Sequence, residues 1–361
     1  MKKVFLYAYD RQNLGDDLFV HTITRRYPNV QFYMWSSREN CRTYACLPNL
    51  KIVDKDSALV RMLNRLRPSL VARYKVWLES RCDAVAYIGG SIFMEYPNWE
   101  QICTWWEYEA KNRPFYVMGA NFGPWHTEAY RARMAGIFGQ MRDICFRDRY
   151  SADLFEQVET VRCAPDILFS YPMPEGSVRE KQVFVSIINC AGRDESHDLG
   201  GFDESYVTNM AALLRRCLDD GCSLVLASFC REEGDEAGIG KILTAMNCDD
   251  NPGIRVLHYD GTNAEELTAE LARSEAVIST RFHGTVLAMA AGRPVLPILY
   301  SDKTLHMLED LDYSGPVIDL RQPESWSGFD GNIRTLPACP VSEAIKTAAQ
   351  KHFEKLDKAL K

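Results

Sequence analysis

A basic residue, a histidine and a glycine stand close together in Ser279-Thr280-Arg281-Phe282-His283-Gly284. Arg281 has a permanently charged fork that fits a carboxylate or a phosphate, and His283 can give or take a proton near neutral pH. Together they suit an anionic substrate that must be protonated during the reaction. Single arginines and histidines are usually surface or packing residues, so this interpretation depends on the elements that position them.

The flanking sequence predicts that these residues lie where a strand gives way to a helix. Residues 276–278 and 294–299 are short apolar runs typical of buried strands. Residues 285–291 are rich in Ala, Leu and Met, and Gly292-Arg293-Pro294 supplies a helix stop. Open parallel sheets bind ligands at such strand ends, and a helix N-terminus offers free N–H groups and a positive dipole end to an anion.

Four more predicted strands end in small or polar residues. The strand at 84–88 precedes Gly89 and Gly90, the strand at 115–119 precedes Asn121, the strand at 143–146 precedes Arg147, and a short strand near residue 161 leads to Asp166. Such strand ends can build a binding edge. Other roles stay open: the glycines can serve a tight turn, Asn121 can close its own turn, and Arg147 can pair with a neighbouring aspartate.

The N-terminal strand, at 3–9, is followed by the turn Asn13-Leu14-Gly15-Asp16-Asp17 and a helix at about 18–27. An aspartate in this turn could orient sugar hydroxyls. An acidic side chain also caps a helix and favours its dipole. We favour capping for at least one of Asp16 and Asp17.

Strands alternate with helices on both sides of residues 171–179, a stretch with two prolines, a glycine and a serine that we interpret as a linker. The pattern predicts an α/β protein with two doubly wound, Rossmann-like domains facing one another across a cleft. We expect an N-terminal domain at 1–172, a C-terminal domain at 180–340 and a C-terminal helix at 341–361.

Composition excludes several classes of protein. The net charge of −7, from 42 basic and 49 acidic residues among 361, argues against nucleic-acid binding by a generally basic surface. No GxGxxG follows a strand, and no HExxH or GxSxG occurs. The 12 cysteines lack zinc-site spacing, so we expect reduced, mostly buried thiols and no metal.

No signal peptide or membrane-spanning segment is evident, so we expect a cytoplasmic protein. Residues 61–81 mix arginines with apolar residues, as basic helices on anionic membranes do. Peripheral contact with the inner face of the membrane is therefore an alternative. We favour a solvated helix face for this stretch because Pro68 interrupts it.

Six short motifs, in order along nearly the whole chain, together resemble the polysaccharide pyruvyl transferases. They are Asn13-x-Gly15-Asp16, Gly89-Gly90, Asn121-Phe122-Gly123-Pro124, Arg147-Asp148-x-x-Ser151, Pro165-Asp166 and Ser279-x-Arg281-x-His283-Gly284. Each motif alone is weakly specific, and the ordered series carries the resemblance. The chain departs from the family pattern at Ser91, where a third glycine is common.

The resemblance implies a fold like the two-domain GT-B glycosyltransferases and transfer of pyruvate from phosphoenolpyruvate to two sugar hydroxyls as a cyclic ketal. The acceptor would be a cell-surface or extracellular polysaccharide or its lipid-linked precursor. It makes the N-terminal domain the acceptor side and the C-terminal domain the donor side, with phosphoenolpyruvate as donor substrate and no cofactor. It assigns His283 as the general acid, Arg147, Arg281, Gly284 and Lys303 to the donor, and Asn13, Asp16, Gly89, Gly90, Asn121 and Asp166 to the acceptor or cleft.

Forming the ketal requires a proton on the methylene carbon of the donor, which a positioned imidazolium can supply. The base for the acceptor stays open among Asp16, Asp166 and His126. Two other functions also stay open. One is a GT-B glycosyltransferase that uses a nucleotide sugar, since fold does not settle function. The other is a non-catalytic carbohydrate-binding relative.

Overall fold

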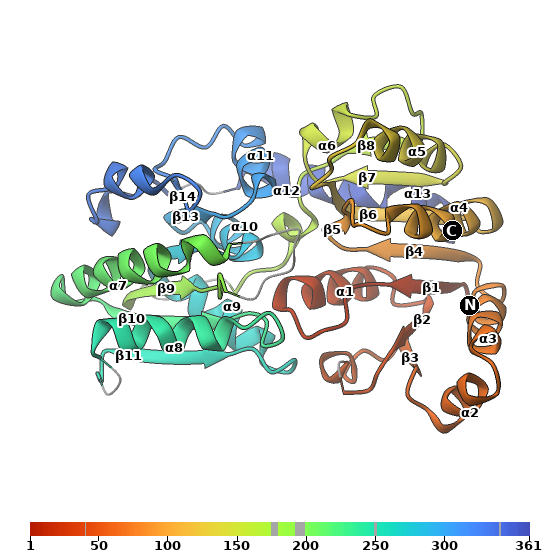
Figure 1. Ribbon diagram of the computed structural model, residues 1–361, viewed down its shortest axis with the longest axis horizontal. Coiled ribbons are helices and arrows are strands. Elements are labelled where there is room, and N and C mark those ends of the chain that lie inside the picture. Colours follow the sequence, from red (N-terminus) through yellow and green to blue (C-terminus); the bar gives the residue numbers. More distant parts are fainter. Residues whose placement is uncertain (40, 175–179, 192–198, 249–250, 339–340) are drawn as a thin grey trace. The chain divides into compact units, whose positions relative to one another are not determined.

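The computed structural model describes residues 1–39, 41–174, 180–191, 199–248, 251–338 and 341–361. The chain forms two compact units, each an α/β domain with a parallel sheet (Figure 1). The first unit comprises Met1–Arg11, Asp16–Ile167 and Ala348–Lys361, and the second comprises Gln12–Gly15 and Leu168–Thr347. Part of the linker expected at 171–179, residues 175–179, lies outside the described residues.

The sheet of the first unit is parallel, in the order β3-β2-β1-β4-β6-β7-β8, with β5 paired to β6. The order changes direction between β1 and β4, which makes their carboxyl ends a topological switch point. Its strands are β1 (Lys3–Tyr7), β2 (Gln31–Ser36), β3 (Leu50–Asp54), β4 (Ala84–Ile88), β5 (Ser91–Phe93), β6 (Phe115–Phe122), β7 (Asp143–Phe146) and β8 (Val161–Cys163).

The helices of this part of the chain are α1 (Leu14–Arg26), α2 (Ala58–Leu66), α3 (Pro68–Glu79), α4 (Trp99–Asn112), α5 (Glu128–Phe138), α6 (Arg149–Asp153) and α13 (Glu354–Leu360). Helices α4 and α5 pack together over an aromatic core that includes Phe93, Trp106 and Phe138. These rings bury large apolar areas. Phe93 meets the Phe138 ring edge-to-face and the Trp106 ring at a tilt, and this packing stabilises the sheet that positions the strand ends.

The sheet of the second unit is also parallel, in the order β11-β10-β9-β12-β13-β14, and its switch point lies between β9 and β12. The strands are β9 (Glu180–Ser186), β10 (Ser223–Ser228), β11 (Ile254–His258), β12 (Ser274–Ser279), β13 (Val295–Leu299) and β14 (Ile318–Asp319). The helices are α7 (Asp203–Asp219), α8 (Asp235–Met246), α9 (Ala264–Arg273), α10 (Phe282–Ala290), α11 (Asp302–Asp310) and α12 (Glu343–Ala349). An aliphatic core fills this unit.

Helix α1 begins earlier than the sequence suggested, at Leu14. The side-chain oxygen of Asn13 accepts the N–H of Gly15 at 3.1 Å, so the asparagine satisfies a free donor at the helix start. Asp16 and Asp17 therefore lie inside the first turn, where they favour the dipole, and not in a preceding loop. Asp17 also accepts a hydrogen bond from the Tyr44 hydroxyl.

Strand β6 extends three residues beyond the expected end because an unpredicted short strand, β5, pairs with its last part. The N–H of Asn121 donates to the carbonyl of Gly90 at 2.9 Å, and the N–H of Gly123 donates to Phe93 at 2.8 Å. Asn121 is thus a strand residue and not a turn residue, with its backbone direction fixed by the pairing.

The C-terminal segment is broken where one continuous helix was expected. A 3-10 turn, η7 (Gln350–Phe353), separates α12 from α13. It places the fully buried His352 so that Nδ1 accepts the Gly119 N–H at 3.2 Å and Nε2 donates to the Pro165 carbonyl at 3.0 Å. Burial lowers the pKa of His352 to about 3, so the ring is neutral near pH 7.

The cysteines in the described part of the chain are free thiols, most of them buried, with Cys46 and Cys163 exposed. Among the described helices, none has the length and apolar character that crossing a bilayer requires.

Candidate functional site

Arg281 and Gly284 lie at the switch point of the second sheet. Strand β12 ends at Ser279, and Arg281 is the residue that caps the start of α10. The Ser279 hydroxyl lies 2.8 Å from the Ser186 hydroxyl, at the end of the neighbouring strand β9. A Cβ at Gly284 would overlap the Ser279 hydroxyl and lie 2.7 Å from that of Ser186. Glycine therefore lets α10 begin directly against the ends of both strands.

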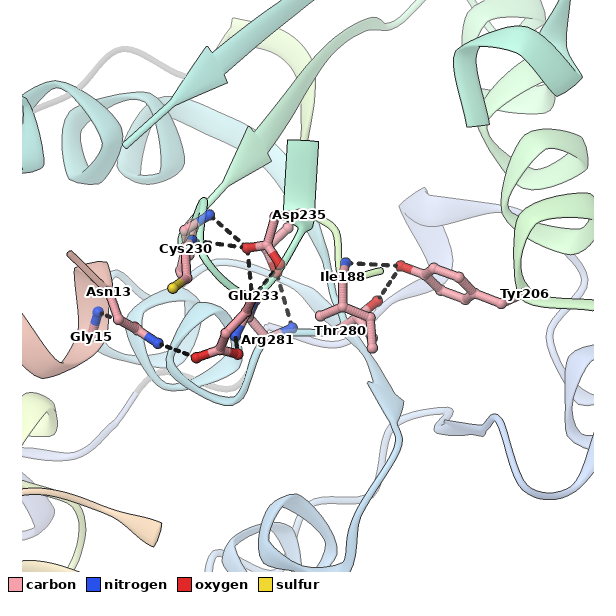
Figure 2. Close-up of polar contacts among 11 residues, drawn as sticks. Asn13, Gly15, Ile188, Tyr206, Cys230, Glu233, Asp235, Thr280 and Arg281 are labelled. Atoms are coloured by element: carbon pink, nitrogen blue, oxygen red, sulfur yellow. Dashed lines mark hydrogen bonds and ion pairs between the residues drawn. The ribbon is translucent and has the colours of Figure 1, made fainter. Parts of the chain in front are cut away.

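Two carboxylates hold the guanidinium of Arg281 (Figure 2). Asp235 binds it through both oxygens, with Nε to Oδ2 at 3.0 Å, and Glu233 accepts from Nη1 at 2.5 Å. Burial lowers the pKa of Arg281, but the Asp235 and Glu233 carboxylates outweigh burial and raise it well above its usual value. Arg281 is therefore charged and held in one orientation.

The two carboxylates differ in how firmly they are fixed. Asp235 is fully buried, and its Oδ2 also accepts the amide N–H groups of Phe229 and Cys230, both at 2.9 Å. The Glu233 side chain is 29% exposed and accepts a longer hydrogen bond, 3.3 Å, from the amide of Asn13 (Figure 2). Asp235 is a permanent partner of Arg281, whereas Glu233 can be reached from solvent.

Neither carboxylate was selected from the sequence. Both follow β10, a neighbour of β9 in the parallel sheet, so their strand ends share one edge. The rule that placed Arg281 at this edge, applied to β10, would have found them.

Residues 12–15 join the same surroundings. The Leu14 N–H donates to the Phe229 carbonyl at 3.0 Å, and Asn13 forms a β-bridge with Cys230. Asn13 thereby contacts Glu233 with its amide nitrogen and caps α1 with its amide oxygen. This double use explains why an asparagine and not an aspartate stands here, since only the amide has both a donor and an acceptor.

His283 is half-buried in the first turn of α10. Its ring meets Phe282 edge-on, with centroids 5.1 Å apart, and lies against the backbone of Gly15. A Cβ at Gly15 would overlap Nδ1 and Cγ of the ring and lie 2.7 Å from the histidine Cβ. Gly15 thus provides the space in which the imidazole lies.

Lys303 lies in the first turn of α11, where its ammonium group is 5.0 Å from the centroid of the Tyr300 ring. Tyr300 is buried and directly follows β13, the strand next to β12 in the sheet. The structure therefore places Lys303 just beyond the strand end that neighbours the one leading to Arg281.

A second set of predicted residues meets at strand ends of the first unit. Arg147 follows β7 and donates from Nη2 to the side-chain oxygen of Asn121 at 2.6 Å and from Nη1 to Asp166 at 3.3 Å. A Cβ at Gly90 would lie 2.7 Å from Nη1, so this glycine admits the guanidinium. Gly89, the residue after β4, precedes it. The ion pair with Asp166, one of the alternatives for Arg147, is present, while Asp148 instead caps α6.

The ordered motifs are those of a known family. A sequence model described as polysaccharide pyruvyl transferase matches residues 13–302. The chain belongs to the polysaccharide pyruvyl transferase family. Apart from Lys303, which is one residue beyond it, both sets of residues fall within the matched range. The fold is the one that the resemblance implied: two parallel-sheet α/β domains like those of GT-B proteins.

Among curated proteins, this pyruvyl transferase family member is 22% identical over 276 residues to the amylovoran biosynthesis protein AmsJ of Erwinia amylovora. The match covers 70% of this chain and 63% of AmsJ, so the chain spans less than two thirds of that relative.

Solved structures share the fold at low identity. The UDP-GlcNAc 2-epimerase of Methanocaldococcus jannaschii has a TM-score of 0.60 at 9% identity, covering 99% of this chain and 100% of its own. HepE of Anabaena, in complex with UDP and glucose, has a TM-score of 0.59 at 11% identity, covering 100% and 99%. At such identities the likeness concerns the fold alone.

Two residues considered for the acceptor base of this pyruvyl transferase family member lie outside the contacts above. Asp16 is half-buried in the first turn of α1, within the first unit. His126 is exposed in the loop before α5, and its backbone N–H donates to Glu95 at 2.5 Å. The third candidate, Asp166, is fully buried against Arg147.

Proposed function

We propose that this protein transfers pyruvate from phosphoenolpyruvate to two hydroxyls of a saccharide and forms a cyclic ketal. The saccharide belongs to a cell-surface or extracellular polysaccharide or to its lipid-linked precursor. The observation that supports this most is the placement of a charged Arg281 and of His283 in one strand-to-helix junction at a switch point. An anion receptor and a proton donor then lie within one turn of each other.

The donor carries a carboxylate and a phosphate, which suit Arg281, Lys303 and the N–H groups at the start of α10. We propose that a donor anion takes the position of Glu233 on Nη1 of Arg281. Asp235 would stay, because it is buried and holds two further backbone donors. Arg281 would thus receive the anion without reorienting.

In the first unit we propose that this strand edge faces the saccharide acceptor, with Arg147 holding the buried Asn121 and Asp166 side chains in place behind it. Anion binding by Arg147 itself stays a prediction. Its guanidinium already binds Asn121 and Asp166, so a direct role would require a partner to give way.

The chemistry balances without a redox cofactor. Protonated His283 donates its proton to the methylene carbon of the donor, and the adjacent carbon becomes electrophilic. One sugar hydroxyl adds to that carbon, phosphate leaves with the electron pair of its C–O bond, and a second hydroxyl adds to close the ring. Of the two hydroxyl protons, one restores His283 and the other leaves on phosphate. Preorganised Arg281 and Lys303 stabilise the negative charge on the departing phosphate.

The first test is calorimetric titration of the protein with phosphoenolpyruvate, beside uridine and thymidine diphosphate sugars. Saturable binding of phosphoenolpyruvate that weakens in Lys303→Met is the expected result, with Lys358→Met on the exposed surface of α13 as the matched control. Binding of a nucleotide sugar alone would overturn pyruvyl transfer in favour of glycosyl transfer.

Substitution of Arg281 by alanine is a poor test, because it leaves Asp235 charged, buried and without its cation, which costs about 3–5 kcal/mol. His283→Gln is better, since the half-buried ring can be replaced without creating a buried charge. We expect His283→Gln to bind phosphoenolpyruvate as the wild type does and to release no phosphate in the presence of saccharide acceptors. A loss of phosphoenolpyruvate binding as large as that expected for Lys303→Met would make His283 an anion ligand and not the acid.

A further inference from the structure

The segment 58–81, which contains α2 and α3 and the two residues after them, has the opposite charge to the rest of the chain. It holds six basic residues (Arg61, Arg65, Arg67, Arg73, Lys75 and Arg81) and one acidic residue, Glu79, for a net charge of +5. The whole chain has a net charge of −7. Such a local reversal of sign marks an electrostatic binding surface for an anionic partner.

The positive charge is concentrated on the outer side of this segment. The five arginines are exposed, and within the described residues none of them forms an ion pair. Lys75 and Glu79 lie inward instead: the Lys75 ammonium is 4.4 Å from the centroid of the Tyr7 ring, and the Tyr7 hydroxyl bonds to Glu79. The only acidic side chain of the segment therefore does not neutralise its outer side.

Apolar side chains share that outer side. Leu59, Met62 and Leu66 are 47%, 51% and 64% exposed, and their spacing puts them along one face of α2. Val60 is the one buried residue of this helix. On α3, Trp77 is 46% exposed, and the Arg81 guanidinium lies over its ring at 4.2 Å.

Trp77 also borders an open pocket of about 300 Å³, which is lined as well by Ala72, Arg73, Val76, Ser80 and Tyr108. Several exposed large apolar residues gathered in one short segment are uncommon on a protein surface and mark an interaction site. Tryptophan and tyrosine next to arginine are the residues that sit at the headgroup level of membranes.

Pro68 does not break this surface. It occupies the first turn of α3, where the missing N–H is not needed, and Arg67 before it is extended. The proline therefore joins two helices that contact each other (Figure 1). The sequence-based reason for interpreting 61–81 as a solvated face is removed.

We propose that the outer side of α2 and α3 docks on the surface of a membrane that contains anionic lipids. Leu59, Met62 and Leu66 enter the headgroup region, and the arginines bind lipid phosphates. A second copy of the chain is a poorer occupant, because a self-complementary contact would bring the same arginines against one another. This inference does not depend on the reaction proposed above.

The test is sedimentation of the full chain with vesicles of phosphatidylcholine, with or without about one third phosphatidylglycerol. Binding is expected only with phosphatidylglycerol, and it should fall at high salt, since at 1 M the screening length shrinks to about 3 Å. Because each arginine near an anionic surface is worth about 1 kcal/mol, Arg61→Gln with Arg65→Gln should reduce binding roughly 30-fold.

Two further variants separate the charge from the apolar contact. Arg42→Gln with Arg142→Gln removes two exposed arginines elsewhere and should bind as the wild type does. Glutamine at Leu59, Met62 and Leu66 keeps helix propensity and should abolish the binding that remains in high salt. Three results would each overturn the proposal. The first is equal binding to both vesicle types, and the second is wild-type binding by the variant with Arg61→Gln and Arg65→Gln. The third is a dimer, seen by sedimentation velocity, that dissociates when Leu59, Met62 and Leu66 are replaced by glutamine.

Discussion

Replacing Gly15 with alanine would put a methyl group where the His283 ring lies. The new Cβ would overlap Nδ1 and Cγ of the ring and come within 2.7 Å of the histidine Cβ. Carbon atoms in contact prefer about 3.5–4.0 Å. The histidine must therefore move by about 1 Å or more, or rotate away from Gly15.

The substitution changes little else. Gly15 lies in the first turn of α1 without a positive φ, so alanine fits the backbone and favours the helix by up to about 1 kcal/mol. Overpacking against the ring costs about 1–3 kcal/mol, so the net change in stability is small. A displacement of about 1 Å of a catalytic group costs about 100-fold in rate. We expect Gly15→Ala to lose about 100-fold in kcat with nearly unchanged stability.

Two measurements check this reasoning. The rate of phosphate release is compared with that of Gly240→Ala, the same change on α8 at a glycine with no neighbour within 4 Å. Urea unfolding of Gly15→Ala is measured with His283 and in a His283→Ala background, where alanine at 15 should stabilise. The coupling between the two sites should be about 1–3 kcal/mol. A wild-type rate with no coupling would refute the placement of the ring against Gly15.

Three further predictions concern other contacts. Glu233→Gln removes a negative charge that competes with the donor for Arg281. The Kd for phosphoenolpyruvate, measured by calorimetry, should fall roughly tenfold, which corresponds to about 1.4 kcal/mol. Weaker binding would refute the proposal that a donor anion replaces Glu233 on Arg281. His352 has a pKa of about 3 in the folded chain, against about 6.5 in the unfolded chain. As the pH falls, the unfolded chain is therefore protonated at His352 before the folded chain is, and the free energy of unfolding decreases. In urea unfolding, the free energy of unfolding should decrease by about 2 kcal/mol from pH 7 to pH 5 in the wild type but not in His352→Gln. An equal dependence on pH in both proteins would contradict this prediction. Gly90→Ala, with its Cβ 2.7 Å from the Arg147 guanidinium, should cost about 1–3 kcal/mol in unfolding free energy, whereas Gly136→Ala, in open space, should not.

Much of the fold was predictable because parallel strands buried on both faces are short apolar runs between polar residues. The bounds at 84–88 and 143–146 match those of β4 and β7. Strand β5 was missed because three residues carry no periodic pattern, and pairing with β6 alone defines it. The break before α13 was missed because it depends on His352 reaching Gly119 and Pro165, which are distant in the sequence.

In the candidate site, too, some features follow from local sequence and others depend on residues that are distant in the sequence. The placement of Arg281 and His283 at a strand-to-helix junction follows from local sequence, and the structure has that junction. The partners of Arg281 do not follow from local sequence, because Asp235 is 46 positions away on another strand end. Gly15 was recognised as part of a motif, but its physical role depends on the ring of His283, which is distant in the sequence.

Both arginines expected to bind anions are already paired with a buried aspartate, Arg281 with Asp235 and Arg147 with Asp166. An unpaired guanidinium at these buried positions would be costly, and a flexible one would have to be ordered by each substrate. A fixed aspartate removes both costs, but it also reduces the net attraction for an anion. The difference at Arg281 is that its second carboxylate, Glu233, is accessible to solvent. We therefore expect donor selection to depend on exchange at Glu233, where a planar carboxylate fits the guanidinium as the glutamate does and a neutral ligand does not.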